Sequence, residues 1–434
     1  MQIAETRVTA SEPTTDYKAM ATVTSLFFAW GFITCLNDIL IPHLKSIFQL
    51  NYFQSMLVQF AFFTGYFLFA QPAGKIIDKI GYKNTMVVGL LLMAVACLGF
   101  IPAATLTTYG IFLAALMVLA GGMTLLQVSA NPYVTALGPV RTASSRLNLT
   151  QAFNSLGTTI APVLGALFIL GTTELADKDV KALSAAKYLL YQQTQAATVK
   201  MPYCVLAGLL VLLAIAIRFS KLPMLQNTSE IRIPVGQKVS KWELLKHGHL
   251  FLGIIGIFLY VGAEVSIGSF LVNYISQPYI GGISIAMAAK FVSYYWGGAM
   301  IGRFLGAAVM QRLPAARVLI FAATGAALLV LTSMLTFGWT AVIAILLVGF
   351  FNSVMFPTIF ALGVEGLGPL TSAGSSMLIM AIIGGAIIPA LQGTIADAIG
   401  IHHAFILPVL CYLYIIYFGW KSSGSRTASL AVAH

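Results

Sequence analysis

The chain has 434 residues, of which 59% are hydrophobic and 9% are charged, and its mean hydropathy is +0.90. A soluble protein carries about 25% charged residues, so this composition excludes a soluble globular protein. The apolar segments are continuous, whereas the strands of an outer-membrane barrel alternate apolar and polar residues. The net charge of +11 comes from basic residues in short segments between the apolar ones, which is typical of topology signals and excludes a nucleic-acid partner. We therefore predict an all-α membrane protein.

Twelve apolar segments are long enough to be transmembrane helices. In chain order they are residues 23–47, 54–76, 84–102, 107–136, 146–171, 200–219, 248–275, 286–310, 317–337, 340–362, 374–398 and 402–420. The longest polar and basic segment inside the chain, residues 220–247, separates the sixth span from the seventh. The expected organisation is an N-terminal tail (1–22), a six-helix bundle (23–219), a linker (220–247), a second six-helix bundle (248–420) and a C-terminal tail (421–434).

The basic residues also predict the orientation of the chain in the membrane. Most of them lie in the tails, in the linker and in the loops on the same side of the membrane as the N-terminus. Basic loops are retained in the cytoplasm, and an even number of spans returns the C-terminus to the side of the N-terminus. We therefore expect both termini to be cytoplasmic.

The two halves share short sequences at corresponding places. Pro132-Tyr-Val-Thr-Ala-Leu-Gly138 in the fourth span recurs as Pro357-Thr-Ile-Phe-Ala-Leu-Gly363 in the tenth span. Parallel repeats of this kind are typical of transporters that bind substrate between their halves, near the middle of the bilayer. A duplicated bundle without transport would show the same repeat, but it would not need charges at that depth.

The loop between the second and third spans carries a charged motif with two glycines. Its residues are Gly74, Asp78, Lys79, Gly81 and Lys83. Glycine permits a tight turn, and a carboxylate can pair with a cation or with the N-terminus of a neighbouring helix. The spacing is similar to the signature loop of major facilitator transporters, and the alternative is an ordinary charged turn.

Only two acidic residues lie deep within the predicted spans. Asp38 is near the middle of the first span, and Glu264 is near the middle of the seventh. An ionisable group at this depth is costly unless it faces protein or a water-filled cavity, so it indicates a functional site. The alternative for both residues is a protonated carboxyl group that joins two helices by a hydrogen bond.

Uncharged polar residues gather on the faces of several spans. The fourth span aligns Thr124, Gln127 and Asn131, and the fifth aligns Gln151, Asn154, Ser155 and Thr158; Trp296 lies in the eighth span and Asn352 in the tenth. Amide groups both donate and accept hydrogen bonds, as sugar hydroxyls require, and an aromatic ring can stack on a pyranose. Helix–helix hydrogen bonding is the alternative for each amide.

The seventh span contains Gly262 and Gly268 around Glu264. Asn273 follows Glu264 by nine residues, so on a straight helix the two side chains point in opposite directions. Either this helix breaks between them, as helices of transporters often do near the middle of the bilayer, or only one of the two faces the interior.

Several segments resemble the fucose:proton symporter family of the major facilitator superfamily. They are residues 30–45, 129–138, 260–270, 356–363 and 374–385, and the likeness covers almost all spans. The resemblance implies a major facilitator fold with two six-helix halves and import of a monosaccharide coupled to a cation by alternating access, in a bacterial inner membrane.

The resemblance also implies roles for individual residues. Asp38 matches the carboxylate of the family's first helix, and Gln151 and Asn154 match its sugar-facing positions. Fucose symporters have a glutamate as the protonation site where this chain has Gln127. Glu264 instead supplies a carboxylate in the seventh span, as in the glucose/galactose or N-acetylglucosamine branch. We therefore expect glucose, galactose, mannose or N-acetylglucosamine as substrate, with fucose:proton symport as the alternative.

The predicted coupling ion is sodium or a proton, bound at Asp38. A proton would bind as the carboxyl group is desolvated, and it would leave as water returns. A sodium ion requires several oxygen ligands, which Asp38, Asn37, Gln127 and Thr124 could supply together with nearby carbonyl groups. The glutamine at position 127 shifts the balance toward sodium. The predicted sugar-binding residues are Asp38, Gln127, Asn131, Gln151, Asn154, Glu264, Trp296 and Asn352.

Other classes of membrane protein fit the sequence less well. A membrane-embedded transferase needs clustered carboxylates for metal–pyrophosphate chemistry, and this chain has only two deep carboxylates. A sensor would need a soluble signalling domain, and a channel would not need two similar halves. We expect no cofactor besides the coupling ion, and no partner besides the sugar and the bilayer, with a monomer as the functional unit.

Overall fold

The computed structural model describes the backbone of residues 14–48, 52–168, 183–197, 199–223, 244 and 246–431. Within these ranges, only the backbone is described for residues 35–47, 52–56, 162–168, 185, 195–196, 285–286 and 424–431. The described residues form helices joined by turns, and no strand occurs among them. The predicted all-α fold is confirmed.

The described part of the first half has five long helices and two short ones. They are α1 (Tyr17–Phe48), α2 (Tyr52–Thr105), α3 (Tyr109–Ala136), η1 (Val140–Thr142), α4 (Ala143–Phe168), α6 (Ala185–Ala197) and α7 (Lys200–Phe219). The second half begins with α9 (Gly248–Ile275), α10 (Ile285–Val309), α11 (Ala315–Leu335), α12 (Gly338–Asn352) and α13 (Met355–Val364). It ends with η2 (Gly368–Leu370), α14 (Thr371–Met380), η3 (Ala381–Ile383), α15 (Gly384–Ile399), α16 (Ile401–Ala404) and α17 (Ile406–Ala431).

Helix α2 contains the second and third spans. The two meet at Gly81, whose φ of 77° and ψ of 169° are not helical. Only glycine adopts this conformation readily, so the chain can reverse direction here within a very short turn. Conversely, α12 and α13 together form the tenth span, and α14 to α15 form the eleventh. The described helices therefore make twelve passes, which correspond to the twelve predicted spans.

The first and last helices of the chain extend beyond the apolar segments that predicted them. Helix α1 begins at Tyr17, before the predicted start at residue 23, and α17 continues to Ala431, beyond residue 420. Hydropathy marks only the part of a helix that lies in hydrocarbon, whereas backbone hydrogen bonding continues through the polar residues beyond it. Most of the predicted linker lies outside the described residues.

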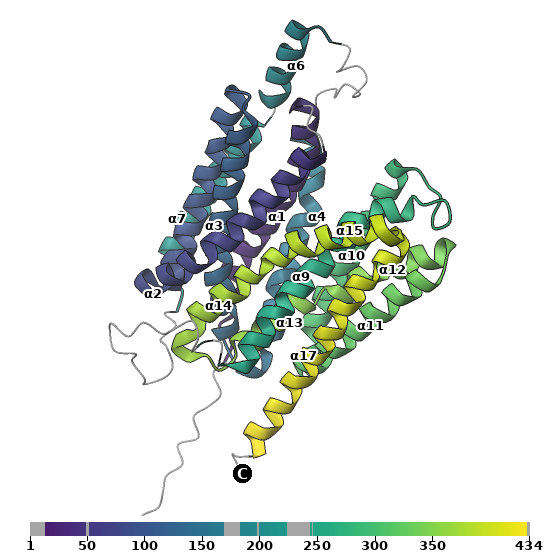
Figure 1. Cartoon of the computed structure of the whole chain (residues 1–434). Coiled ribbons are helices and arrows are strands. Elements are labelled where there is room, and N and C mark those ends of the chain that lie inside the picture. Colours follow the sequence, from purple (N-terminus) through teal and green to yellow (C-terminus); the bar gives the residue numbers. More distant parts are fainter. Residues whose placement is uncertain are drawn as a thin grey trace, which may run out of the picture.

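The two halves lie side by side and diverge toward one end (Figure 1). We call the end where α1 begins and α17 finishes the termini end. In Figure 1 the helices of the first half and those of the second approach each other there and separate toward the opposite end. Helix α4 runs beside α10 and α13, and α14 runs beside α2 and α3, so these helices join the halves.

Hydrogen bonds join the halves near the termini end. Ser145 at the start of α4 donates to the carbonyl oxygen of Ala307 on α10 at 2.6 Å. One turn further, the Asn148 amide donates to the hydroxyl of Thr358 on α13 at 3.3 Å. Both Ser145 and Asn148 are buried. The structure therefore has the halves closed against each other at the termini end.

Glycine allows α4 to pack very closely against α1. A Cβ atom at Gly157 would lie 2.4 Å from the carbonyl oxygen of Phe28, and one at Gly31 would lie 2.1 Å from that of Asn154. No side chain fits in this space, so the two backbones touch. The contact fixes the face that α1 and α4 together present to the other half.

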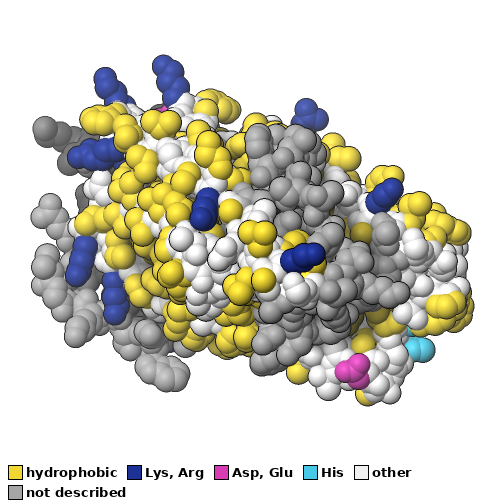
Figure 2. All heavy atoms as spheres, turned by 90° about the horizontal axis from the view of Figure 1, so that it is seen from above, with side chains coloured by type: hydrophobic (Ala, Val, Ile, Leu, Met, Phe, Trp, Pro, Cys, Tyr) yellow, Lys and Arg dark blue, Asp and Glu magenta, His cyan; other side chains and the backbone are white. Residues whose placement is uncertain are grey.

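The outer surface is apolar, as a bilayer requires. Eight stretches of the described helices are long and apolar enough to cross a membrane, and one of them, Leu57–Thr105, covers two passes. Large apolar side chains such as Leu212, Phe321 and Leu335 are exposed on these helices. Viewed from the end opposite to the termini, charged side chains are scattered among hydrophobic and uncharged ones (Figure 2). The exposed apolar side chains along the helices fit hydrocarbon rather than water.

Candidate functional site

Asp38 and Asn37, the predicted coupling residues of the first span, lie on α1, but their side chains are outside the described residues. One turn before Asp38, the hydroxyl of Thr34 donates to the carbonyl oxygen of Trp30 at 3.0 Å. Trp30 is partly buried and packs against Phe27 with a centroid distance of 5.7 Å. The backbone of α1 thus places Asp38 one turn beyond Thr34 and two turns beyond the packed Trp30.

The three predicted polar residues of α3 are all buried, and they differ in their partners. The Thr124 hydroxyl donates to the carbonyl oxygen of Ala120 at 2.7 Å, within its own helix. Gln127 donates from Nε2 to the Tyr66 hydroxyl on α2 at 2.6 Å, but its Oε1 has no partner among the described residues. Neither side-chain atom of Asn131 has such a partner. Gln127 and Asn131 therefore retain hydrogen-bonding capacity.

The two predicted amides of α4 have different surroundings. Asn154 donates from Nδ2 to the carbonyl oxygen of Phe27 on α1 at 2.9 Å. This bond joins two helices, which is the structural alternative considered for each amide. Gln151 is 4% exposed, and its Nε2 has no partner among the described residues. Of these two residues, Gln151 is the one that offers an unused donor.

Helix α9 is continuous, so it has no break between Glu264 and Asn273. The other predicted alternative holds, in which only one of these two residues faces the interior. Glu264 is 14% exposed and accepts a hydrogen bond from the Tyr260 hydroxyl at 2.8 Å. Asn273, on the other side of the helix, is exposed. Of Glu264 and Asn273, Glu264 is therefore the one that α9 directs inward, and Gly262 and Gly268 do not interrupt the helix.

The break lies instead in the tenth span, between α12 and α13. Pro357 has no amide hydrogen, so the carbonyl group of Ser353 has no helical partner there, and the proline ring displaces this carbonyl. Arg303 donates from Nε to the Ser353 oxygen at 3.2 Å. Tyr260 lies 3.0 Å from the carbonyl oxygen of Asn352, the last residue of α12. Side chains of α10 and α9 thus satisfy the carbonyl groups at the break.

Arg303 connects this break with Glu264 and with the other half. Its Nη2 atom lies 3.9 Å from Glu264 Oε1, and the Arg303 side chain is 13% exposed. Its Nη1 atom donates to the hydroxyl of Ser155, which belongs to α4 in the first half. The guanidinium group therefore bridges the two halves, from the last third of α10 to the middle of α4.

Asn352 and Trp296 both contact Tyr295. Asn352 is fully buried and donates from Nδ2 to the Tyr295 hydroxyl at 2.8 Å, whereas its Oδ1 has no partner among the described residues. Trp296 is 41% exposed and meets the Tyr295 ring edge-on at a centroid distance of 5.2 Å. A Cβ atom at Gly268 would lie 3.5 Å from the Trp296 ring. The tryptophan therefore presents much of its surface outside the packed core.

The motif between the second and third spans lies against the other half. A Cβ atom at Gly74 would lie 2.2 Å from the hydroxyl of Ser376 on α14. Asp78 accepts a hydrogen bond from the hydroxyl of Ser372, also on α14. Both contacts cross from the first half to the second at the termini end. The motif thus contributes to the closure between the halves.

The basic residues of the motif have other positions. Lys83 donates to the carbonyl oxygen of Ser220 at 2.6 Å, which ties the start of the third span to the end of α7. Lys79 is exposed. Gly81 forms the turn itself.

Three residues of the site, Tyr66, Tyr295 and Arg303, were not predicted from the sequence. A signal was present for each of them, since a tyrosine hydroxyl or an arginine inside a membrane span needs a partner. The sequence does not say which partner each group finds, because the partners are on helices far away along the chain.

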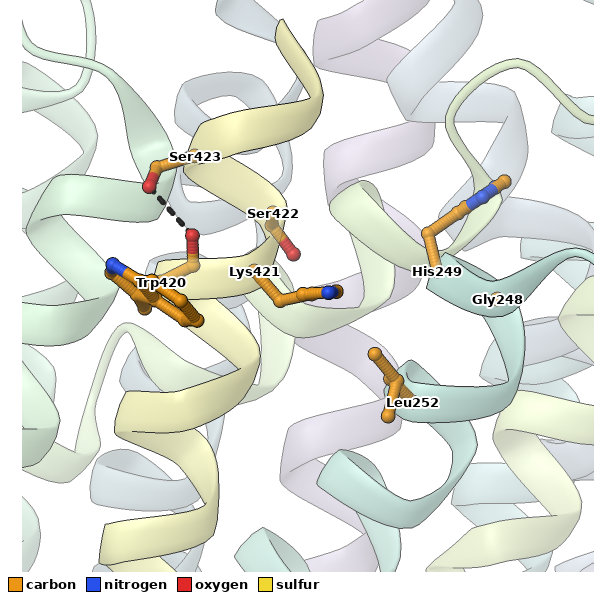
Figure 3. Close-up of a pocket in the computed structure, with 7 residues that line it drawn as sticks. All are labelled: Gly248, His249, Leu252, Trp420, Lys421, Ser422 and Ser423. Carbon is orange, nitrogen blue, oxygen red and sulfur yellow. Dashed lines mark hydrogen bonds between the residues drawn. The ribbon is translucent and has the colours of Figure 1, made fainter.

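A pocket of about 600 Å³ lies away from these residues, at the termini end. It is formed by the start of α9, with His249 and Leu252, and by the part of α17 that includes Trp420 and Lys421 (Figure 3). Figure 3 shows the Lys421 side chain extending into the space between the two helices. None of the predicted site residues lines it.

A family model described as Major Facilitator Superfamily matches residues 22–379 of the chain. A glucose/galactose transporter of Brucella abortus (strain 2308) is 51% identical over 407 residues, which are 94% of each chain. The L-fucose-proton symporter of Escherichia coli (strain K12) is 36% identical over 414 residues, covering 94% of this chain and 93% of its own. The predicted resemblance is confirmed.

The fold is also found in solved structures. The crystal structure of the transporter FucP in the outward conformation has a TM-score of 0.86 and 35% sequence identity, and the match covers 93% of this chain and 98% of that one. The proton:xylose symporter XylE shares the fold, with a TM-score of 0.65 at 13% identity. The chain is a multi-pass membrane protein that belongs to the Major Facilitator Superfamily.

Proposed function

We propose that the protein imports a hexose of the glucose or galactose type across a bacterial inner membrane, in symport with a cation. The observation that carries this proposal is the 51% identity to a glucose/galactose transporter along 94% of both chains. The relatives named as fucose symporters are less similar, at 36% identity or below. Fucose therefore remains the competing substrate in the test below.

Unpaired amide groups in the interior support a sugar site. Asn131, Gln151 and Gln127 each have a buried side-chain atom without a partner among the described residues, and so does Asn352 in the other half. An unsatisfied buried polar group costs about 1–3 kcal/mol. Sugar hydroxyls both donate and accept, so a bound hexose would satisfy these amides and recover that cost. Trp296 could cover an apolar face of the sugar ring.

For the coupling ion we propose a proton. The Escherichia coli and Haemophilus influenzae relatives are both named proton symporters. Asp38 is the proposed coupling residue of the first half, because a carboxyl group in a span can bind a proton when its surroundings become dry. Sodium, bound by oxygen atoms of Asp38, Asn37, Gln127 and Thr124, is the alternative that the same experiment separates.

We propose that transport proceeds by alternating access of one site between the halves. The contacts of Ser145, Asn148 and Asp78 would keep the termini end closed while the site is open to the opposite side. With both termini in the cytoplasm, this is an outward-facing state. Gly74, Lys79, Gly81 and Lys83 would serve this closure through the turn that holds Asp78 in place.

The protein would work as a monomer in the lipid bilayer, with no cofactor besides the coupling ion. A transferase or a passive channel would not accumulate free sugar against a gradient, so uphill uptake separates these classes from a symporter.

Uptake of labelled glucose into proteoliposomes tests the proposal. A proton gradient or a sodium gradient is imposed separately, and unlabelled galactose, mannose, N-acetylglucosamine and L-fucose are added as competitors. We expect accumulation driven by the proton gradient and competition by galactose. Accumulation driven only by sodium would reject proton coupling, and competition by fucose alone would reject the hexose assignment.

The variant Asp38→Asn tests the coupling residue in the same vesicles. Sugar counterflow needs no net movement of the ion, so it should persist, whereas gradient-driven accumulation should be lost. Normal accumulation by this variant would exclude Asp38 as the coupling residue.

A further inference from the structure

The Tyr260 hydroxyl lies between two acceptors that it cannot serve together. Its oxygen is 2.8 Å from Oε1 of Glu264 and 3.0 Å from the carbonyl oxygen of Asn352. A hydroxyl group has one hydrogen, so it donates to one acceptor at a time. If Glu264 is charged, Tyr260 donates to the carboxylate and the carbonyl oxygen at the end of α12 loses that donor.

A protonated Glu264 resolves this conflict. The carboxyl O–H then donates to the Tyr260 oxygen, and Tyr260 donates to Asn352, so both short distances correspond to hydrogen bonds. The arrangement of the heavy atoms thus accommodates both charge states, and the direction of the Tyr260 hydroxyl depends on which state is present.

The position of Arg303 depends on the same charge. A direct charge-assisted hydrogen bond is about 2.7–2.9 Å long, whereas Arg303 Nη2 is 3.9 Å from Glu264. The guanidinium group uses its other nitrogens for the Ser353 carbonyl oxygen and the Ser155 hydroxyl. A negative charge on Glu264 would attract Nη2 and draw the group away from Ser155, and neutralisation would release it.

We propose that Glu264 binds and releases a proton during transport, and that Arg303 transmits its charge to the contact with Ser155 in the other half. This inference rests on the proposed function, to which it adds a second proton site. The carboxylate takes a proton from water on the open side and returns it to water on the other side. Only an O–H bond forms and breaks. The neutral state favours the Arg303–Ser155 contact, and the charged state weakens it.

Glu264 is the only carboxyl group among the described side chains of this cluster. The titratable side chains around it are Tyr260 on its own helix, Arg303 and Tyr295 on α10, and Tyr412 on α17. The ordinary pKa is about 10 for tyrosine and higher still for arginine, so these groups keep their protons. The proposed site also compensates for Gln127, which cannot titrate.

Infrared difference spectroscopy of the purified protein tests the proton site without any transport. Spectra recorded between about pH 5.5 and about pH 8.5 should contain the band of a protonated carboxyl group that titrates. In a protein that already carries Asp38→Asn, so that the other proposed proton site contributes no band, Glu264→Gln should remove this band, whereas Asp397→Asn, which alters an exposed carboxylate on α15, should retain it. An unchanged titrating band in Glu264→Gln would overturn the proposal, whatever the protein transports.

Proteoliposomes test the consequence for coupling. Glu264→Gln keeps the size of the side chain and cannot lose a proton, so its proton-driven accumulation, divided by its own rate of equilibrium sugar exchange, should fall at least about tenfold relative to wild type. Asp397→Asn should accumulate normally. Full accumulation by Glu264→Gln would overturn the proton role. If wild type transports no hexose, the infrared result still decides the proton site.

Distances between spin labels test the connection through Arg303. The labels are placed at Leu106 and Leu335, which are exposed at the end opposite to the termini in the two halves. In wild type, acid pH should favour the longer separation and alkaline pH the shorter one. Glu264→Gln should show the long separation throughout, and Ser155→Ala the short one. Wild-type pH dependence in Ser155→Ala would overturn the role of this contact.

Discussion

Two polar clusters among the described residues, one in each half, have opposite character. The amide cluster of α3 and α4, formed by Gln127, Asn131 and Gln151, has buried side-chain atoms without partners among the described residues. The charged cluster of α9, α10 and α12 has most of its groups connected; it is formed by Tyr260, Glu264, Tyr295, Arg303 and Asn352.

The difference indicates a division of labour. Unpaired donors and acceptors are costly without a ligand, so the amide cluster has the properties of a binding surface. A connected network that contains a carboxylate and an arginine has the properties of a switch, because one proton changes several bonds together. We therefore expect the amide cluster to govern sugar affinity and the charged cluster to govern stability and coupling.

The largest effect on sugar affinity is expected from Asn131→Leu. Leucine has a similar size but cannot form hydrogen bonds, so loss of two bonds to the sugar should weaken binding by roughly 2 kcal/mol, or about 30-fold. Removal of an unpaired buried amide should leave thermal stability unchanged or raised. Isothermal titration of the detergent-solubilised protein with glucose, together with a thermal unfolding curve, measures both.

Ser129→Ala is the matched control on the same helix. Ser129 is also fully buried, but its hydroxyl already donates to the carbonyl oxygen of Leu125 at 2.6 Å. Its replacement should leave sugar affinity unaltered. Equal losses in Asn131→Leu and Ser129→Ala would mean that the helix, rather than the amide, determines affinity.

Asn352→Leu should have the opposite effect on stability. Asn352 donates to the Tyr295 hydroxyl inside the charged cluster, and its loss leaves that hydroxyl without this donor. The expected destabilisation is about 1–2 kcal/mol, seen as a lower midpoint of thermal unfolding without ligand. Gln277→Leu removes an amide from a turn at the surface and should not lower the midpoint. A higher midpoint for Asn352→Leu would contradict the comparison of the clusters.

Much of the fold followed from local features of the sequence. Apolar length predicted the spans, and the short repeat around Pro132 and Pro357 predicted two similar halves. The glycine motif predicted the turn at Gly81, because a positive φ is a property of the residue itself. The inward position of Glu264 followed from the cost of a charge in a membrane span.

The partners of these residues could not be predicted, since they depend on tertiary contacts. Pro132 and Pro357 occupy corresponding places in the repeat, yet α3 is continuous and the tenth span breaks after Asn352. The break is tolerated because Arg303 and Tyr260, from other helices, satisfy its carbonyl groups. Likewise, Asn154 and Gln151 look alike in the sequence, and only the approach of α1 gives Asn154 a partner.

Gln127→Glu should give the amide cluster a carboxyl group that titrates, as proposed for Glu264 in the charged cluster, and so make sugar affinity depend on pH. Position 127 is 2% exposed and lies beside the Tyr66 hydroxyl, so a carboxylate there would be costly when charged. Sugar affinity should become about tenfold weaker at about pH 8.5 than at about pH 5.5, beyond any change in wild type. Gln127→Met, which cannot titrate, is the control. Binding by Gln127→Glu with the wild-type pH profile would show that this position does not face the sugar.

The smallest effect is expected from Trp296→Leu, which removes an aromatic surface without touching either network. Trp296 is 41% exposed, and its neighbour Tyr295 retains the bond from Asn352. Loss of stacking should raise the KM for glucose about three- to fivefold, equivalent to roughly 0.7–1 kcal/mol, with little change in thermal stability. Trp339→Leu is the matched control, because Trp339 is 51% exposed on α12 and packs against Phe291 near the end of the bundle opposite to the termini. If both variants raise KM equally, the effect belongs to the membrane surface, and Trp296 is not part of the binding surface.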